Sequence, residues 1–197
     1  MNEAQKLFKE FKETEFSNDL EIINFVQTHL DTLLSEATQD LNDIGFTYIE
    51  YIESLYNQSR YSRVLEFIDR IETIEYFNEY RKTDPSFDEN IRFYKYASLS
   101  RKHKTNESLK GFSNLVLDFP ENEDYPDWVR ELKYKKRNKI LGLIMFIMLG
   151  ILFISLVIRN FYPSEAIKSL GNKLEILFVI SFLGYYANNL ISKKASR

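Results

Sequence analysis

An uninterrupted run of 19 uncharged residues, 140–158, constrains this chain more than any other feature of its sequence. Fourteen of the 19 residues are Ile, Leu, Phe or Val. As a helix the run would be about 28 Å long, close to the thickness of the hydrocarbon core of a bilayer. The insertion free energies of these side chains sum to roughly −4 to −8 kcal/mol. We therefore predict a transmembrane helix at 140–158, and the sequence argues against a purely soluble enzyme.

A second apolar segment, 174–191, follows a predicted external loop at 159–173. It carries Glu175 near one end and Asn188 and Asn189 near the other, where headgroups can reach polar side chains. Three small residues recur at every third position, a spacing that allows close helix packing in lipid: Ser181, Gly184 and Ala187. We predict a second transmembrane helix here, with an interfacial helix as the alternative. The spans could also support a homo-oligomer.

Five basic residues precede the first predicted span: Lys133, Lys135, Lys136, Arg137 and Lys139. The loop at 159–173 holds three basic residues, and the tail at 192–197 adds three more. By the positive-inside rule, two spans then place both termini in the cytoplasm, at a bacterial inner membrane or a plasma membrane. Basic runs also bind nucleic acid. Next to a span, however, such a run is better explained by topology and by anionic lipid headgroups, so we expect no nucleic-acid partner.

Charge divides the chain into two parts. Residues 1–132 hold 15 Lys and Arg against 27 Asp and Glu, whereas residues 133–197 hold 11 against 2. The acidic part would attract cationic partners and would be repelled by anionic lipid. We therefore expect a cytoplasmic domain at 1–132, joined to the membrane by a polybasic segment at 133–139.

The sequence offers little for catalysis. It has no cysteine, which excludes disulfides, thiol catalysis and thiolate metal sites. Its two histidines, His29 and His103, are isolated, and we expect both to be solvated. Phosphate-binding glycine loops, nucleophile elbows and zinc-protease helices are absent. The acidic segment at 121–127 lacks EF-hand spacing. We expect no catalytic, cofactor-binding or metal-binding residues, and hence no enzyme.

Apolar residues recur at helical spacing almost throughout residues 1–132, which predicts an all-α fold. The first sixteen residues form an amphipathic helix rather than a cleavable signal. Asn18, with Glu21 three positions later, predicts the start of a second helix that runs to about residue 40. Ser86 with Glu89 predicts a capping box at the start of a later helix.

Two helical hairpins are predicted within 48–71 and 86–115. A shift of 44 residues superposes their apolar positions: Ile49 on Phe93, Ile52 on Tyr96, Leu55 on Leu99, Leu65 on Leu109, Ile68 on Phe112 and Ile71 on Leu115. Ser108, Phe112 and Pro120 have the spacing of the small, aromatic and proline residues in the second helix of a tetratricopeptide repeat, which the chain therefore resembles. Unlike that repeat, the chain lacks the tryptophan and glycine of the first helix, and its interval exceeds the usual length of about 34 residues. An irregular helical bundle is the alternative fold.

The resemblance implies a binding surface formed by the first helix of each hairpin. Tyr48 and Tyr51 superpose on Arg92 and Lys95 under the same shift, and tyrosine and arginine are common interface anchors. We therefore predict that these four residues bind a cytoplasmic protein or peptide, and the acidic charge of 1–132 favours a cationic one. The expected function is a membrane-anchored interaction module. The alternatives are an oligomerising membrane effector or small channel with a cytoplasmic sensing domain, and an accessory subunit of a larger membrane complex.

Overall fold

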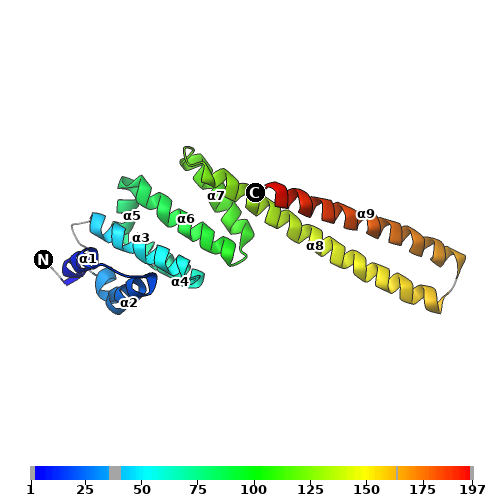
Figure 1. Ribbon diagram of the computed structural model, residues 1–197, viewed down its shortest axis with the longest axis horizontal. Coiled ribbons are helices and arrows are strands. Elements are labelled where there is room, and N and C mark those ends of the chain that lie inside the picture. The colour runs from blue at the N-terminus through cyan, green and yellow to red at the C-terminus, as the bar shows by residue number, and fades with distance from the viewer. Residues whose placement is uncertain (1–2, 36–40, 163, 196–197) are drawn as a thin grey trace. The chain divides into compact units, whose positions relative to one another are not determined.

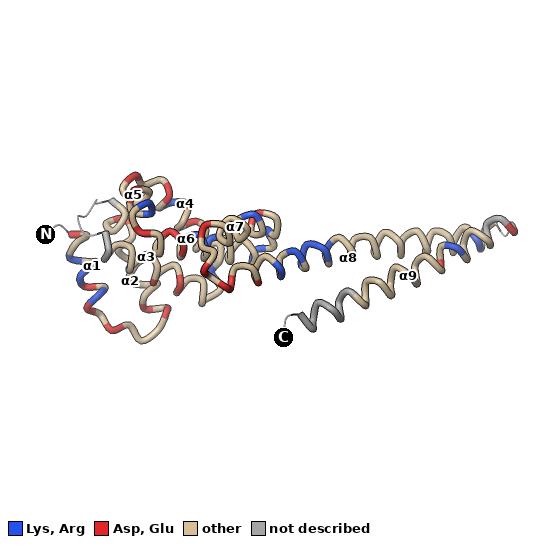
Figure 2. The backbone as a smooth tube through the Cα atoms, turned by 90° about the horizontal axis from the view of Figure 1, so that it is seen from above, with Lys and Arg blue, Asp and Glu red and all other residues tan. Residues whose placement is uncertain are grey.

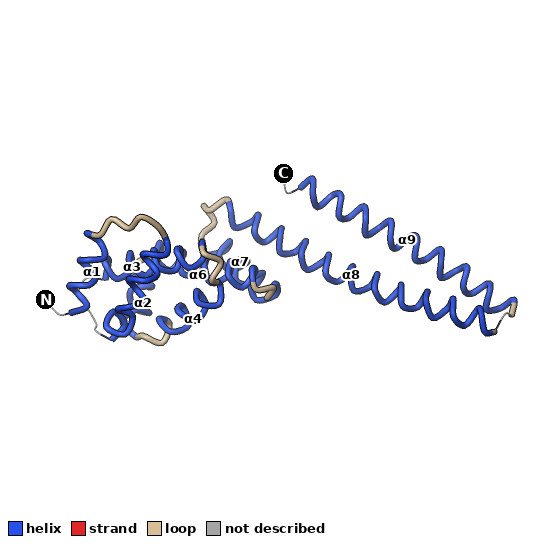
Figure 3. Tube along the Cα trace, turned by 60° about the horizontal axis from the view of Figure 1, so that its bottom comes forward, coloured by secondary structure: helices blue, strands red, loops and turns tan. Residues whose placement is uncertain are grey.

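The computed structural model of the chain describes residues 3–35, 41–162 and 164–195. Within those ranges every regular element is a helix and there is no strand (Figure 3), so the predicted all-α class is confirmed. The helices are α1 (Glu3–Glu13), α2 (Asp19–Ser35), α3 (Leu41–Asn57), α4 (Tyr61–Ile71), α5 (Glu75–Thr83), α6 (Pro85–Arg101), α7 (Thr105–Asp118), α8 (Asp124–Phe161) and α9 (Glu165–Ala195). The chain divides into two compact units, Met1–Val129 and Arg130–Arg197, which we call unit 1 and unit 2.

Unit 1 is built from helix pairs that pack in a repeating pattern (Figure 1). Helix α3 contacts both helices of the preceding pair, α1 and α2, and also its own partner, α4. Helix α6 does the same, because it contacts α3, α4 and its own partner, α7. The first helix of each new pair therefore lies against both helices of the pair before it.

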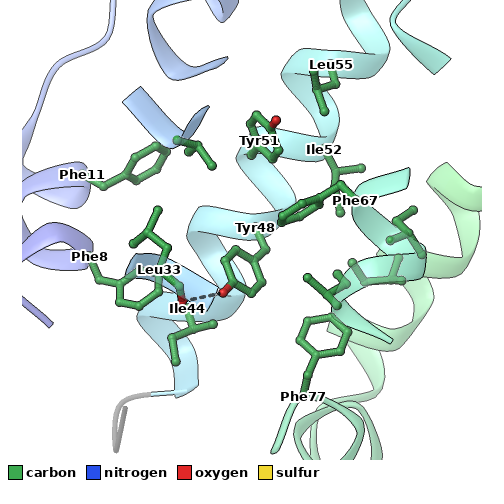
Figure 4. Close-up of a cluster of buried hydrophobic side chains, with 14 of the residues drawn as sticks. Phe8, Phe11, Leu33, Ile44, Tyr48, Tyr51, Ile52, Leu55, Phe67 and Phe77 are labelled. Carbon is green, nitrogen blue, oxygen red and sulfur yellow. Dashed lines mark hydrogen bonds between the residues drawn. The ribbon is translucent and has the colours of Figure 1, made fainter. Parts of the chain in front are cut away.

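The core of unit 1 is centred on α3, and Tyr48 is its largest fully buried side chain. Figure 4 shows Phe8 of α1 on one side of Tyr48 and Phe67 of α4 on the other, with ring centroids 6.2 and 5.3 Å away. The Tyr48 hydroxyl donates a hydrogen bond of 3.0 Å to the Leu33 carbonyl at the end of α2. Each large apolar side chain buried in this way contributes roughly 1.5–3 kcal/mol to folding.

The turns that close the α3–α4 and α6–α7 pairs have the same backbone geometry. Ser59 and His103 lie 44 residues apart and have φ angles of 57° and 60°, in the left-handed region. In each turn the next residue donates its N–H to a carbonyl five positions earlier: Arg60 to Leu55 at 2.8 Å, and Lys104 to Leu99 at 2.9 Å. These bonds satisfy carbonyls that a helix end leaves unpaired. The 44-residue period of the sequence is therefore present in the backbone of both turns.

Helix α5, Glu75–Thr83, was not predicted from the sequence and fills the interval between α4 and α6. It packs on α6 and buries Phe77 and Tyr80. Nine residues with a mainly polar sequence carry little periodic signal, because fewer than three turns of helix show an apolar stripe poorly. The 44-residue period thus contains a third, short helix.

Two predicted helix starts have different outcomes. The predicted start at Asn18 is confirmed, since its Oδ1 accepts hydrogen bonds from the N–H groups of Leu20 and Glu21 at 3.0 and 3.3 Å. The capping box at Ser86 is wrong, because α6 already begins at Pro85 and is capped by Asp84, which accepts from the Phe87 N–H at 3.1 Å. Proline suits the first helical position because its φ is fixed and its missing N–H would be unpaired there.

Glu89, predicted to close that capping box, instead connects α6 to the beginning of α8. One carboxylate oxygen of Glu89 accepts hydrogen bonds from the Tyr125 hydroxyl at 2.6 Å and from the Asn122 side chain at 2.9 Å. Trp128, the only tryptophan, stacks on Phe112 with ring centroids 4.8 Å apart. The first residues of α8 therefore cover the α6–α7 pair within unit 1.

Unit 2 contains most of α8 and all of α9. Of the described residues, α8 is the one helix long and apolar enough to cross a membrane by length and composition. Figure 2 shows the basic residues of α8 followed by a stretch without charged residues. The side chains of α9 from 188 onward lie outside the described part of the chain, so the second span stays a prediction.

The two helices of unit 2 approach each other near their connection. Arg159 of α8 forms an ion pair of 3.8 Å with Glu175 of α9, and Gly171 lies against the Ser155 side chain. Helix α9 begins at Glu165, so most of the loop predicted at 159–173 is helical. Residues 165–173 include alanine, leucine, glutamate and lysine, which are good helix formers. The segment is therefore helical where a loop was predicted.

Gly111 provides a direct test of the packing between α6 and α7. A Cβ atom at this position would overlap the ring of Tyr96 on α6, so Gly111→Ala must displace that ring or separate the two helices. Overpacking of this kind costs about 1–3 kcal/mol, which exceeds the helix-propensity gain of about 1 kcal/mol. We expect a lower free energy of unfolding, measured by denaturant titration with Trp128 fluorescence. The control is Asn114→Ala at an exposed position of α7, and equal stability of the two variants would contradict the close packing.

Candidate functional site

The four predicted partner-binding residues occupy two different environments. Tyr48 and Tyr51 lie in the core, 0% and 3% exposed, and the Tyr51 hydroxyl is 3.5 Å from the side-chain nitrogen of Gln27. Burial raises the pKa of both phenols above the usual value for tyrosine. Their side chains stabilise unit 1 from within and are not presented to a partner by this structure.

Arg92 and Lys95 lie on α6 within a network of ion pairs. Arg92 bonds to Asp88 at 3.2 Å and to Asp118 at 2.5 Å, and its guanidinium lies 5.7 Å from the centroid of the Phe119 ring. Burial alone would lower the pKa of Arg92, but the bonds to Asp118 and Asp88 raise it above the usual value. Lys95 bonds to Glu72 at 2.6 Å.

Arg81 joins the two parts of this network, because it contacts both Glu72, at 3.2 Å, and Asp88. Lys95 also pairs with Asp69 of α4 at 3.5 Å, so the network connects α4, α5, α6 and α7. Most of its side chains are less than a third exposed. Arg92 and Lys95 are both engaged within the unit, and their predicted role in partner binding has no further support from this geometry.

A different set of residues is partly accessible on the first helices of the two pairs. Glu50, Glu53 and Tyr56 of α3 and Tyr94 of α6 are all half-buried, and we call them the acidic–aromatic patch. The Tyr56 and Tyr94 rings lie edge to face with centroids 5.5 Å apart. Burial, followed by the charge and hydrogen bond of Glu53, raises the pKa of Tyr94.

The carboxyl group of Glu50, in the same patch, has an altered pKa. Burial raises the pKa of Glu50, and the neighbouring carboxylates of Glu53 and Asp19 raise it further. The 44-residue shift also superposes Glu50 on Tyr94, one position beyond the apolar pair of Ile49 and Phe93. This equivalence could have indicated the patch from the sequence. Only the packing shows that this side of α3 is partly accessible.

A basic cleft lies at the two equivalent turns. Its volume is about 720 Å³, and it is open to solvent. The lining residues are Gln27, Ser59, Arg60, Tyr61, Ser62, Arg63, Arg101, Lys102 and His103. Lys102 Nζ donates to the Ser62 hydroxyl, and Arg101 Nε donates to the Tyr56 hydroxyl at 3.4 Å. Only the fold brings the turn at His103 beside the turn at Arg60.

The histidines and acidic residues show no metal-binding arrangement in the described ranges. No group of three or more His, Asp or Glu side chains there could hold a metal ion. His103 lines the basic cleft, whereas the His29 ring packs on Phe25 with centroids 5.0 Å apart.

The residues predicted to set topology and to pack the spans all lie in unit 2. The five basic residues predicted before the span are helical residues of α8: Lys133, Lys135, Lys136, Arg137 and Lys139. Ser181 is half-buried, Gly184 and Ala187 are exposed, and a Cβ atom at Gly184 would have no neighbour within 4 Å. This small-residue face is therefore not covered by described residues of the same chain.

Comparison of the chain with protein-family models, with curated proteins and with solved structures finds no match. The surfaces of unit 1 and the apolar helices of unit 2 are therefore the features of this chain that indicate a function.

Substitution of Arg92 tests whether this residue has a structural role or a partner-binding role. Arg92→Gln leaves Asp88 and Asp118 without the cation that they share. We therefore expect the free energy of unfolding, measured by denaturant titration, to fall by about 1–2 kcal/mol. Lys110→Gln, which removes the same charge from an exposed position on α7, is the control and should change stability little. If Arg92→Gln is as stable as the control, the ion pairs contribute nothing and Arg92 is available for a partner.

Glu50 gives a stability change that depends on pH. A carboxyl whose pKa is higher in the folded state than in the unfolded state costs stability once the pH rises through the folded-state value. Glu50→Gln removes that cost, so the variant should resist denaturant better than the wild type at about pH 7, with no gain near about pH 4. The control is Glu121→Gln, an exposed acid, which should show no such pH-dependent gain. A gain for Glu50→Gln of equal size at both pH values would contradict this assignment.

Proposed function

We propose that this chain is a membrane-anchored protein–protein interaction module in which unit 1 recruits a cytoplasmic partner and unit 2 holds it at the membrane. One observation supports this more than any other. The apolar side chains of unit 1 are gathered into a core, whereas the large apolar side chains of α8 beyond residue 139 are largely exposed. Exposed apolar surface of this extent is typical of contact with lipid or with another protein.

We also propose that both helices of unit 2, α8 and α9, lie in the membrane. Exposed apolar residues continue along α9, including Ile176, Val179 and Leu183. If both helices cross, the basic residues before 140 and after 191 favour a cytoplasmic location for both termini. We therefore propose a plasma membrane or bacterial inner membrane as the location.

The packing of unit 1 supports the proposed likeness to tetratricopeptide repeats. Each pair packs its first helix against both helices of the preceding pair, and the two turns share their geometry. Ser108 and Phe112, which carried the resemblance, are fully buried, and the Ser108 hydroxyl donates to the Tyr96 carbonyl at 2.8 Å. Stacked hairpins of this kind present the first helices for binding.

The acidic–aromatic patch favours a partner segment that contains lysine or arginine. Glu50 and Glu53 supply negative charge, and the half-buried rings of Tyr56 and Tyr94 can receive a cation on their faces. A cation near Glu50 would also relieve the mutual repulsion of the carboxylates. The excess of acidic residues in the first 132 positions would attract such a segment over a longer range.

A second candidate is an oligomerising membrane effector or small channel, or an accessory subunit of a membrane complex. The specific observation in its favour is the uncovered face at Gly184, where a second helix could approach closely. In these alternatives unit 2 carries the function, and unit 1 acts as a sensor or an attachment.

Co-purification from mild detergent tests the proposal with the full chain carrying a C-terminal tag. We expect cytosolic proteins that are enriched by the wild type to fall at least about tenfold with Glu50→Lys/Glu53→Lys, because attraction to a cation becomes repulsion. The control, Glu10→Lys/Glu121→Lys, makes the same charge change at exposed positions and should retain them. Trp128 fluorescence would verify that both variants are folded. If only integral membrane proteins or further copies of the chain co-purify, the second candidate replaces the first.

A further inference from the structure

The basic cleft is an exception within an acidic unit. Four of its nine lining residues are Arg or Lys, a fifth is His103, and none is Asp or Glu. Ser59, Tyr61 and Ser62 add hydroxyl groups, which can also donate hydrogen bonds to an anion. The lining therefore supplies many donors and positive charges to one volume.

The cations of the cleft are less neutralised than those of the ion-pair network on α6. Arg81 and Arg92 each contact two carboxylates, and their side chains are 20% and 16% exposed. Arg63 pairs with Glu66 at 3.2 Å, in an exposed ion pair of the kind that contributes little. Arg60 and Lys102 have no ion pair with any described residue, although Lys102 donates to Ser62. Positive charge in the cleft is therefore available to an external anion.

The two turns hold these groups in place. Ser59 and His103 adopt the left-handed conformation, and the hydrogen bonds of Arg60 and Lys104 close each turn. The basic residues beside them are consequently attached to an ordered backbone. Little conformational entropy of the backbone would be lost when an anion binds.

We propose that this cleft binds a compact ligand that carries two or more phosphate groups. Guanidinium groups match phosphate oxygens with paired hydrogen bonds, and the hydroxyls complete the set of donors. A peptide is the weaker candidate, because peptide sites depend on pockets for apolar or aromatic anchors. Tyr61 is the only aromatic or aliphatic residue of the lining apart from His103. The same phosphate chemistry could come from a soluble polyphosphate or from the headgroup of a phosphoinositide.

Calorimetric titration of the full chain in non-ionic detergent tests this proposal. The soluble probes are tripolyphosphate and inositol hexakisphosphate. The lipid probe is a short-chain phosphoinositide bisphosphate, compared with its deacylated headgroup. We expect saturable binding that weakens as salt concentration increases. A lipid form that binds at least about tenfold more tightly than its headgroup would identify a membrane source; equal affinities would identify a soluble one.

The variant Arg60→Gln/Lys102→Gln removes two exposed cations of the cleft and leaves neutral polar side chains in their place. We expect its affinity to fall at least about tenfold for each charge removed, because each charge-assisted hydrogen bond contributes about that much. The matched control is Lys6→Gln/Lys110→Gln, which makes the same charge change on exposed positions of α1 and α7. This control should bind the probes as the wild type does.

Three results would overturn the proposal. The first is no saturable binding of any phosphate probe to the wild type. The second is an equal loss of affinity in the control variant, which would indicate attraction to net charge rather than a site. The third is displacement of the bound probe by a polyglutamate peptide at the same concentration as by tripolyphosphate, which would replace the phosphate ligand with an acidic peptide. None of these results depends on the acidic–aromatic patch. The proposed recruitment function is therefore tested separately, by the co-purification experiment.

Discussion

The burial of α3 on more than one side is the constraint on which the rest of unit 1 depends. Tyr48 contacts Phe8 of α1, Phe67 of α4 and Phe77 of α5, and its hydroxyl is satisfied by the Leu33 carbonyl. An unsatisfied hydroxyl at such a depth would cost about 1–3 kcal/mol. One side chain thus connects the first pair, the second pair and the added helix α5. The surfaces available for binding are those that this packing leaves on the outer sides of α3 and α6 and at the turns.

Acidic and basic side chains of unit 1 form separate clusters. Acids gather beside half-buried aromatic rings on α3 and α6, and cations gather at the two turns. A third group of opposite charges neutralises itself among α4, α5, α6 and α7. The neutralised group stabilises the packing of four helices. The two unbalanced groups adjoin, because Arg101 of the cleft donates to the Tyr56 hydroxyl of the patch. They can attract ligands of opposite sign at neighbouring places, so a single small unit could respond to two kinds of molecule.

Several features could be predicted from the sequence because they depend on local chemistry. Helical periodicity, the Asn18 cap and the apolar run of α8 need only neighbours along the chain. The burial of Tyr48 and Tyr51 could not be found in this way, because a helix that is covered by other helices on several sides has no single apolar stripe. Helix α5 was too short to show a period, and Pro85 moved the cap from Ser86 to Asp84. The basic cleft required knowledge of which two turns the fold brings together.

Ser59 and His103 also bear on the stability of the two turns. Glycine adopts the left-handed conformation without the steric cost that other residues incur, which is of the order of 1–2 kcal/mol. Glycine at both positions would therefore be less strained than the serine and the histidine that the chain has there. The hydroxyl and the imidazole that line the basic cleft are thus placed there at a cost in backbone strain.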